Sequence, residues 1–517
     1  MSRGVVAAGH PETARAGVWA LREGGNAVDG AVAAMAASMV AESPLTGLGA
    51  GGYMLVSEPG SDPLLLDFFV AAPGLGDRER RSELVPVEVD FGDTTQAFNI
   101  GAASCGVPGT PAGIAEANRR FGSMPLADLL EPAVKLGRDG VPLNRQQAYL
   151  LKILEPVHLA APEAAAVYMP DGSPLREGDS FFFSELAEAL ERLGADGAEP
   201  FYRGDLARDI CEWVGARGGL LAAEDLAAYE PIARRPIRTS FRGTEIFTNP
   251  PPSAGGLLIS LTLALLERLQ SVDLRTVIAA MEEAQEARTK DFTAGLYEPG
   301  FAGRFLAAEV VEAAARRCRR SVRPSRGPGG RGDALGSTTH ITVVDGEDRC
   351  ASVTCSNGTG SGLLVPGTGV HVNNMLGEQD LNPFGFHATE PARRMPSMMA
   401  PTVVRRDGVV EAGLGSAGSN RIRSAVVQAI LRIVVDRMPA QAAVAAPRVH
   451  YERGAVQAEP GIAENDLRAL SERGYEVVRW SEQNLFFGGV SAVARDPRTG
   501  ALSGGGDPRR GGAAALA

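Results

Sequence analysis

A run of residues at 28–40 limits the possible folds more than any other feature of the chain. It is rich in alanine and, wound as a helix, is apolar around nearly its whole circumference. A helix of this kind must be covered on all sides, so it belongs between layers of a large core. Neither this run nor any other reaches the ~18 apolar residues that a membrane span requires. The sequence therefore predicts a layered protein with no membrane partner.

Composition and charge exclude several further classes. Of 517 residues, 44% are hydrophobic and 22% charged, as in ordinary globular proteins, which excludes collagen-like and globally disordered chains. The net charge of −11 offers no basis for binding nucleic acid, so small molecules are the expected partners. The first residues contain one arginine and too short an apolar run for a secretory signal, which favours a cytoplasmic location.

Cysteines and histidines give no sign of a metal or another cofactor. The five cysteines are odd in number and scattered, unlike a disulfide framework or a zinc ribbon. The six histidines show no ligand spacing. We therefore expect reduced thiols, no metal and no cofactor.

The first part of the chain alternates helices with glycine-rich turns and strands. A helix is expected at 11–23, and a glycine-rich turn at 46–52 leads into strands at 53–56 and 63–70. This turn differs from a nucleotide-binding loop, because the dinucleotide fingerprint has a strand before its glycines and a helix after them. Phosphate binding is therefore not predicted here.

Helical and strand patterns continue up to a basic segment. Helices are expected from 106 onward, at 124–137, at 225–229 and at 257–269, and a strand at 236–247. Residues 316–337 contain seven arginines, several glycines and prolines, and little to bury, which predicts an exposed, mobile linker. The alternative, a basic arm for nucleic acid, is disfavoured because no aromatic side chains accompany the charges.

Directly after this linker, two alternating segments predict a β-hairpin. Residues 338–344 and 349–355 alternate polar and apolar side chains, and residues 345–348 between them are typical of a turn. If Val344 pairs with Cys350, Thr338 lies opposite Ser356. Opposed residues have Cβ atoms ~4.5–5.5 Å apart, so two hydroxyls would lie side by side at the end of the hairpin.

A threonine at this boundary gains a chemical role if the chain is cut before it. The Thr338 hydroxyl can attack the Ser337 carbonyl and form an ester that water hydrolyses. The new α-amine, with a pKa of ~7.7–8.0, can then act as the base for the same hydroxyl. His340 shares the face of Thr338, and we expect it to form hydrogen bonds rather than act as the base. Taken alone, the pattern also fits a purely structural strand start.

Several segments resemble γ-glutamyltranspeptidases and follow the family's order along nearly the whole chain. The segments that resemble the family's large subunit are 46–55, 106–110, 218–220 with 224–229, and 250–256. Those that resemble its small subunit are 336–345, 373–374, 401–404 and 415–422. Agreement between independent motifs makes the resemblance more specific than any single motif.

The resemblance implies an N-terminal-nucleophile hydrolase with a four-layer αββα sandwich. Its precursor would be cut into a large subunit, 1–337, and a small subunit, 338–517, that share one core. Thr338 matches the family nucleophile, and Ser356 matches the hydroxyl residue that holds the new amine. Gly418 and Ser419 match the pair whose backbone N–H groups form the oxyanion hole, and Ser419 retains that N–H although its Cβ restricts the backbone.

Further matches concern the substrate. Asn357 falls near a substrate-binding asparagine, and Glu378 can meet an ammonium group. Phe69 stands where family members that take γ-glutamyl groups have an arginine, and Ser397 is followed by Met398 instead of a second serine. This departure removes a carboxylate clamp whose charge-assisted bonds are each worth about 1.5–3 kcal/mol. Phe69 can equally just continue an apolar strand, and three arginines are candidate substitutes for the clamp: Arg393, Arg394 and Arg421.

Three functions remain open on this basis. The leading hypothesis is an autoprocessed hydrolase or acyltransferase that cleaves a γ-glutamyl amide such as glutathione and passes the acyl group to water or an amine. The missing clamp motivates a second hypothesis, a member with another donor, as in cephalosporin acylases, oxamate amidohydrolases or C–C hydrolases of secondary metabolism. The third is an unprocessed binding protein, motivated by the joint changes at Phe69, Met398 and Ser419.

Overall fold

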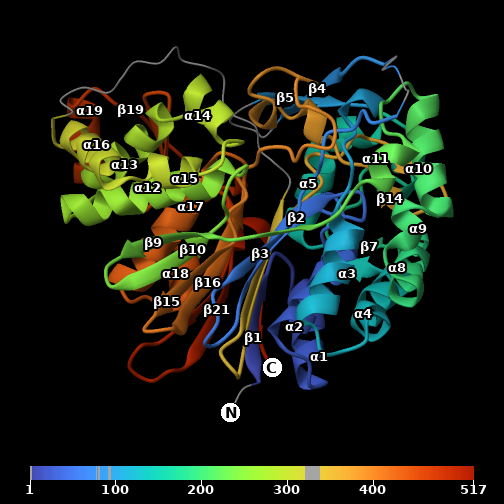
Figure 1. The fold of residues 1–517 in the computed structure, drawn as a ribbon, viewed down its shortest axis with the longest axis horizontal. Coiled ribbons are helices and arrows are strands. Elements are labelled where there is room, and N and C mark those ends of the chain that lie inside the picture. The colour runs from blue at the N-terminus through green and yellow to red at the C-terminus, as the bar shows by residue number, and fades with distance from the viewer. Residues whose placement is uncertain (1–2, 77–78, 80–81, 91–94, 321–337) are drawn as a thin grey trace.

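The computed structural model of the chain describes residues 3–76, 79, 82–90, 95–320 and 338–517. Two β-sheets face each other at its centre, and helices cover the outer side of each sheet (Figure 1). One helical layer, on the right of the view, comes from the first part of the chain, coloured blue to green. The αββα sandwich expected from the sequence is confirmed.

The seven-stranded sheet combines strands from both sides of residues 321–337. Its order is β22 (Ala513–Leu516), β1 (Gly4–Ala8), β11 (Thr339–Asp345), β12 (Cys350–Ser356), β2 (Gly51–Ser57), β3 (Leu64–Phe68) and β8 (Ile232–Arg234). All neighbouring strands are antiparallel. The strands predicted at 53–56 and 63–70 are therefore present as β2 and β3.

The six-stranded sheet has a similarly mixed origin. Its order is β21 (Leu502–Gly506), β20 (Gly489–Arg495), β16 (Val409–Ala417), β15 (Thr402–Arg406), β10 (Thr244–Thr248) and β9 (Ile237–Phe241). The single strand predicted at 236–247 is wrong, because β9 and β10 form a hairpin. Arg242 and Gly243 have φ angles of 50° and 74°, which is the two-residue turn that such a hairpin favours.

The apolar run at 28–40 lies where the sequence placed it, in the interior. It forms α2 (Ala27–Ala41), whose residues are all buried. Asn26 caps its start, and Asp29 completes the capping box. On one side α2 packs on β11 and β12, and on others it meets its helical neighbours in this layer. These are α1 (Pro11–Arg22), α3 (Thr110–Phe121) and α4 (Leu126–Asp139), and α4 in turn packs on α8 (Ser184–Asp196).

The second helical layer covers the six-stranded sheet. It contains α12 (Ala254–Leu269), α13 (Leu274–Glu286), α16 (Ala308–Arg320) and α17 (Arg421–Ile430). The helices predicted at 124–137, 225–229 and 257–269 correspond to α4, α11 and α12. Further helices are α5 (Arg145–Ile153), α6 (Glu155–His158), α7 (Pro162–Tyr168), α9 (Glu199–Tyr202), α10 (Asp205–Ala216), α11 (Ala223–Ala227), α14 (Lys290–Gly295), α15 (Phe301–Phe305), α18 (Ala440–Ala445) and α19 (Glu464–Glu472).

Small sheets complete the molecule. They are formed by β4 (Val85–Asp90) with β5 (Thr95–Ile100), β6 (Val141–Pro142) with β7 (Ser180–Phe181), β13 (Leu364–Val365) with β14 (Val370–His371), and β17 (Val449–Glu452), β18 (Ala455–Ala458) and β19 (Glu476–Arg479). Within the described ranges, no helix combines the length and the apolarity needed to cross a bilayer.

The predicted linker at 316–337 begins later than the composition suggested. Residues 316–320 are the last turns of α16, so the prediction is wrong for them. Arg317 donates hydrogen bonds from Nε and Nη2 to the Glu283 carboxylate of α13, which anchors this end of the helix. The rest of the predicted linker lies outside the described residues.

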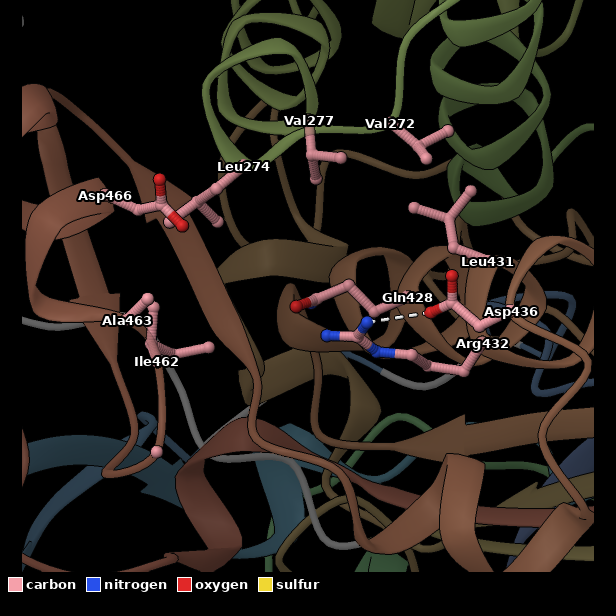
Figure 2. A pocket seen from close by; sticks show the side chains of 11 residues that line it. Val272, Leu274, Val277, Gln428, Leu431, Arg432, Asp436, Ile462, Ala463 and Asp466 are labelled. Carbon is pink, nitrogen blue, oxygen red and sulfur yellow. Dashed lines mark hydrogen bonds and ion pairs between the residues drawn. The ribbon is translucent and has the colours of Figure 1, made fainter.

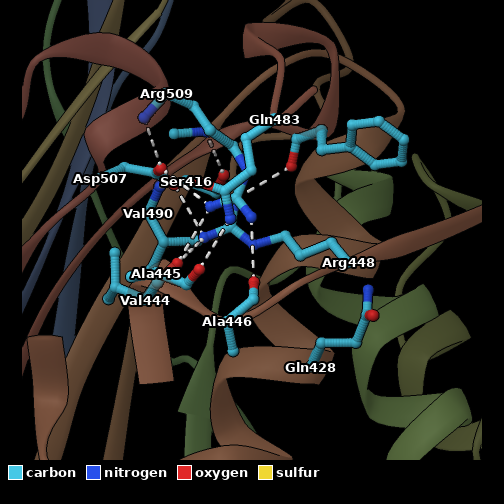
Figure 3. A network of polar contacts seen from close by, with 12 residues as sticks. Ser416, Gln428, Val444, Ala445, Ala446, Arg448, Gln483, Val490, Asp507 and Arg509 are labelled. Carbon is cyan, nitrogen blue, oxygen red and sulfur yellow. Dashed lines mark hydrogen bonds and ion pairs between the residues drawn. The ribbon is translucent and has the colours of Figure 1, made fainter. Parts of the chain in front are cut away.

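A buried ionic network holds the C-terminal part of the chain in place (Figure 3). Asp507 pairs with Arg448 at 2.7 Å and with Arg509 at 3.1 Å, and Arg509 also pairs with Glu459. The side chains of Arg448 and Arg509 also donate to backbone carbonyls at the end of α18. With every charge paired, this network fixes the turn that leads into β22, the neighbour of β1.

Candidate active site

The hairpin has the register that the sequence predicted. Val344 pairs with Cys350, and Thr339 pairs with Cys355. One step farther, the Thr338 hydroxyl donates a hydrogen bond to Ser356 Oγ at 3.1 Å. Thr338 is buried and is the first described residue after 321–337. The structure thus brings the two hydroxyls together at the end of the hairpin.

Ser356 is held in place by the loop that follows it. Its Oγ accepts a second hydrogen bond from the Gly358 N–H at 3.1 Å. Gly358 has a φ of 66°, and a Cβ there would lie 1.9 Å from Asn374 Oδ1, so only glycine fits. Asn374 in turn accepts from the Thr359 N–H at 2.8 Å. The partner of Thr338 is therefore fixed before any substrate arrives.

A cleft opens beside these two hydroxyls and contains most of the predicted site. Its lining includes seven of the residues that sequence analysis singled out: Phe69, Thr338, Ser356, Glu378, Ser397, Met398 and Ser419. The other lining residues are Gly358, Met375, Asp380, Leu381, Met399 and Ile422. Two of the lining residues that were missed lie close in the sequence to predicted ones. Asp380 lies two positions after Glu378, and Ile422 lies one helical turn after Ser419.

Two predicted residues do not line the cleft. Asn357 is fully buried, and its side-chain amide donates to the His371 carbonyl at 3.2 Å, so it braces the loop instead of facing a substrate. Gly418 lies behind Ser419 with a φ of 117°, and a Cβ there would lie 2.9 Å from Gly488 Cα. The tight packing explains why this position is glycine.

Ser419 has an unusual backbone for a residue with a side chain. Its φ of 46° lies in the left-handed region, which costs roughly 1–2 kcal/mol for an L-residue other than glycine. It stands between the end of β16 and the start of α17. Strained backbone of this kind concentrates at functional sites, where it aims particular groups at a substrate.

Glu378 is a buried carboxylic acid at the cleft. Burial is the main cause that raises its pKa, to about 7, and the nearby charge of Asp380 acts in the same direction. Its Oε1 makes no hydrogen bond to the described residues. A carboxyl group in this state can accept a hydrogen bond from a substrate amine or ammonium group.

None of the three candidate arginines takes the place of the missing clamp. Arg394 pairs with Asp67 at 3.4 Å, and its guanidinium lies 4.2 Å from the ring centroid of Tyr229. Arg393 lies 4.4 Å from the Tyr297 ring, and Arg421 donates to the Phe486 carbonyl. The described lining of the cleft therefore contains two carboxyl groups and no arginine or lysine.

Phe69 is part of the packed core as well as of the cleft wall. Its ring stacks on Tyr53 with centroids 5.3 Å apart, and its carbonyl accepts from Tyr229 Oη at 2.8 Å. Only 1% of the residue is exposed. Phe69 directly follows β3 and so lies just outside the strand, and it both packs in the core and lines the cleft.

His340 forms hydrogen bonds, as expected. Its Nδ1 contacts Thr354 Oγ1 at 2.7 Å and its Nε2 contacts Thr342 Oγ1 at 2.9 Å. Burial lowers the pKa of His340 to about 3, so the ring is neutral at ordinary pH. The histidine braces the hairpin behind Thr338 and does not reach the cleft.

Another cavity, of about 310 Å³, shares no lining residue with the cleft (Figure 2). Its walls mix apolar and polar side chains from the start of α13, the end of α17 and the start of α19, and they include an Arg432–Asp436 ion pair at 2.8 Å. It contains none of the predicted site residues. Across the described part of the chain, no three His, Cys, Asp or Glu side chains gather as metal ligands would.

Comparisons with known proteins bear on the whole chain. The family model described as gamma-glutamyltranspeptidase matches residues 13–517. The Acylase ACY 1 proenzyme of Pseudomonas sp. (strain SE83) is 33% identical over 514 residues, covering 97% of this chain and 91% of the relative. The glutathione hydrolase proenzyme of Escherichia coli (strain K12) is 30% identical over 539 residues, covering 96% and 90%. The crystal structure of cephalosporin acylase from Bacillus halodurans superimposes with a TM-score of 0.84 at 26% identity, covering 99% and 96%.

Proposed function

The chain belongs to the γ-glutamyltranspeptidase family of N-terminal-nucleophile hydrolases, and we propose that it is a self-cleaving acylase with Thr338 as its nucleophile. Self-cleavage before Thr338 would yield the segments 1–337 and 338–517. The Thr338 hydroxyl then attacks the donor carbonyl, and its proton passes through the free α-amine to the departing nitrogen. Water or an amine afterwards releases the acyl group from the ester.

The contacts around Thr338 support this mechanism. Ser356 Oγ lies 3.1 Å from Thr338 Oγ1, on the side where it can orient both the hydroxyl and the new amine. An α-amine with a pKa of ~7.7–8.0 is a suitable base near neutral pH. The N–H groups of Gly418 and Ser419 are the proposed donors to the oxyanion that forms during attack.

We further propose that the preferred acyl group carries no α-carboxylate. The observation that carries this proposal is the lining of the cleft, in which Phe69 replaces the expected arginine and the charged groups are Glu378 and Asp380. A donor carboxylate would find no arginine or lysine among the described lining residues and would lie near two acids. Each charge-assisted bond it forgoes is worth about 1.5–3 kcal/mol.

Six apolar side chains also line the cleft, beside four hydroxyl residues and Gly358. They are Phe69, Met375, Leu381, Met398, Met399 and Ile422. Methionine is flexible and polarisable and adapts to apolar groups of varied shape. Two of the similar proteins are named acylases, which is consistent with a donor other than a γ-glutamyl amide. A γ-glutamyl donor is the second candidate, because Glu378 suits an ammonium group and the glutathione hydrolase relatives are also similar.

Four p-nitroanilides separate these candidates: γ-glutamyl, glutaryl, 4-aminobutyryl and butyryl. They differ only in the presence of the carboxylate and the amine, so each group's contribution is read independently. We expect kcat/KM for the two donors without a carboxylate to exceed that for the other two by about tenfold or more. Fastest release from the γ-glutamyl compound would contradict the proposed donor and support the second candidate.

The nucleophile is tested by substitution of Thr338. Thr338→Ala should abolish both self-cleavage and turnover, whereas Thr338→Ser should retain part of each, because only the latter keeps a hydroxyl. Denaturing electrophoresis and mass spectrometry of the products give the readout. Cleavage in the alanine variant would refute the assignment, and an intact wild-type chain would support the remaining hypothesis of a binding protein.

A further inference from the structure

Glu42 is a buried carboxyl group that the mechanism above does not use. It follows α2 directly and is 1% exposed. Its Oε2 accepts a hydrogen bond from Thr339 Oγ1 at 2.6 Å, and its Oε1 accepts one from Thr13 Oγ1 at 2.8 Å. One side chain thus joins α1, the end of α2 and the first residue of β11.

The surroundings of Glu42 are shaped to hold it. A Cβ on Gly9 would lie 2.2 Å from Glu42 Oε2, so the close approach of this backbone requires glycine. Burial raises the pKa of Glu42 to about 7, while the two hydroxyl groups and the charge of Arg510 oppose that shift. Burying a carboxyl group is costly, and these specific partners offset the cost.

Thr338 and Thr339 point to opposite faces of the hairpin. Thr339 lies on the face of Ile341 and Val343, which pack in the core with α2, whereas His340 lies on the face toward the second sheet. Ser356 holds Thr338 on one face, and Glu42 holds Thr339 on the other. The dipeptide next to the proposed cleavage point is therefore held from two sides.

We propose that Glu42 is a positioning residue for self-cleavage, acting through the Thr339 hydroxyl. The inference rests on the proposed function. In the precursor, the Thr338 nitrogen is an amide and cannot act as a base, so the geometry of attack gains importance. Thr338 Oγ1 bonds to the Ser337 carbonyl carbon, the C–N bond breaks, and the hydroxyl proton ends on the released amine. Water then hydrolyses the resulting ester.

Glu42 suits this task because it belongs to the helical layer and not to the hairpin. Its backbone directly follows α2, which packs on β11 and β12, so the Thr339 hydroxyl is held by a residue that lies outside the hairpin. A hydrogen bond to a charged acceptor is shorter and stronger than one between neutral groups. Loss of this bond should let the dipeptide adopt orientations from which the attack is slow.

The two threonines that donate to the Glu42 carboxylate offer a matched pair of variants. Thr339→Val removes the hydroxyl beside the cleavage point, and Thr13→Val makes the same chemical change on the other oxygen. Glu42→Gln keeps the shape, and Thr339→Ser restores a hydroxyl. The full chain is synthesised by cell-free translation, so that the start of the reaction is defined. Loss of the precursor over time is followed by denaturing electrophoresis. The melting temperature of each product serves as a check on folding.

We expect Thr339→Val and Glu42→Gln each to slow cleavage by at least about tenfold. Their combination should be no slower than the slower single variant, since both act on the same contact between residues 42 and 339, Thr339→Val by removing the donor and Glu42→Gln by removing the acceptor's charge. Thr339→Ser should be within about threefold of the unmodified chain, and so should Thr13→Val. Equal slowing by Thr13→Val and Thr339→Val, or normal cleavage in Thr339→Val and Glu42→Gln, would overturn the inference. Failure of the unmodified chain to cleave before Thr338 would instead overturn the proposed function.

Discussion

Ser419 combines a strained backbone with a position at the cleft. Its left-handed backbone turns the chain between β16 and α17 next to Thr338, yet its side chain adds strain at that φ. Glycine would adopt the same conformation without the clash of a Cβ. The function proposed for Ser419 depends on its backbone N–H, which glycine also has.

We therefore expect Ser419→Gly to stabilise the protein by up to about 1 kcal/mol and to retain turnover. The gain is smaller than the full strain because glycine loses more conformational freedom on folding. The melting temperature and kcat on a p-nitroanilide donor are the measurements. A lower melting temperature, or a loss of turnover by tenfold, would show that the serine side chain itself is needed.

We expect Glu378 to make the binding of an amine-bearing donor depend on pH. Its pKa is raised to about 7, mainly by burial, so the charged form that attracts an ammonium group becomes populated only as the pH rises through that value. The KM of the 4-aminobutyryl donor relative to the butyryl donor should therefore fall between about pH 6 and pH 8. The ratio cancels the titration of the Thr338 amine, which affects both donors.

The control for this pH dependence is Glu378→Gln, in which the ratio of KM values should be flat over the same range. A ratio that is independent of pH in the unmodified enzyme would contradict contact between Glu378 and the donor amine. A ratio that rises with pH would have the wrong sign for a carboxylate and would point to another titrating group.

At the residue level, the sequence predicted the pair of hydroxyl groups better than it predicted the positions of the three candidate arginines. The hydroxyl pair followed from hairpin register alone, because alternation and a short turn are local features. The positions of the arginines could not be predicted, since Arg394 is taken up by Asp67, which is distant in the sequence. Asn357 illustrates the same limit, because its role depends on a bond to the His371 carbonyl across a loop.

At the scale of elements, local pattern was a good guide where burial was uniform. The run at 28–40 is apolar on every side and is buried on every side. The pattern failed at 236–247, where a two-residue turn interrupts an otherwise strand-like run, and at 316–320, where an ion pair to Glu283 in another helix extends α16. Gly243 was a local signal of the turn within the first segment, whereas Glu283 lies outside the second segment and is not visible in its composition.

The contact between α3 and β3 gives a prediction at this scale. Gly113 in α3 lies so close to the buried ring of Phe68 that a Cβ would come within 2.2 Å of it. We expect Gly113→Ala to destabilise the protein by about 1–3 kcal/mol, because a rigid ring in a packed core cannot move aside freely. The lowered melting temperature is the measurement.

Gly303 offers a matched control for this substitution. It also lies in a helix, α15, and a Cβ there would meet nothing within 4 Å. Gly303→Ala should be neutral or stabilise by up to about 1 kcal/mol, because alanine favours the helical backbone. Similar destabilisation in both variants would mean that replacing a helical glycine is destabilising in itself, and that the contact with Phe68 is not the cause.

The two central sheets each combine strands from the segments before and after residues 321–337. In the seven-stranded sheet, β22, β11 and β12 follow residues 321–337, whereas β1, β2, β3 and β8 precede them. We expect the two pieces to co-elute after cleavage and to unfold in one transition, because neither has a complete sheet alone. Size-exclusion chromatography and calorimetry test this, and two separate transitions would contradict it.

The place of β1, hydrogen-bonded to β11 on one side and to β22 on the other, bears on genetic complementation. Exchange of a segment between two cleaved molecules would require β1 to break its pairing with β11 and β22 at once. We therefore expect the two segments of one chain to remain associated. A defect upstream of the cut and a defect downstream of it, carried by different molecules, should therefore remain defects after mixing. Each active molecule is expected to contain two segments that come from the same precursor chain.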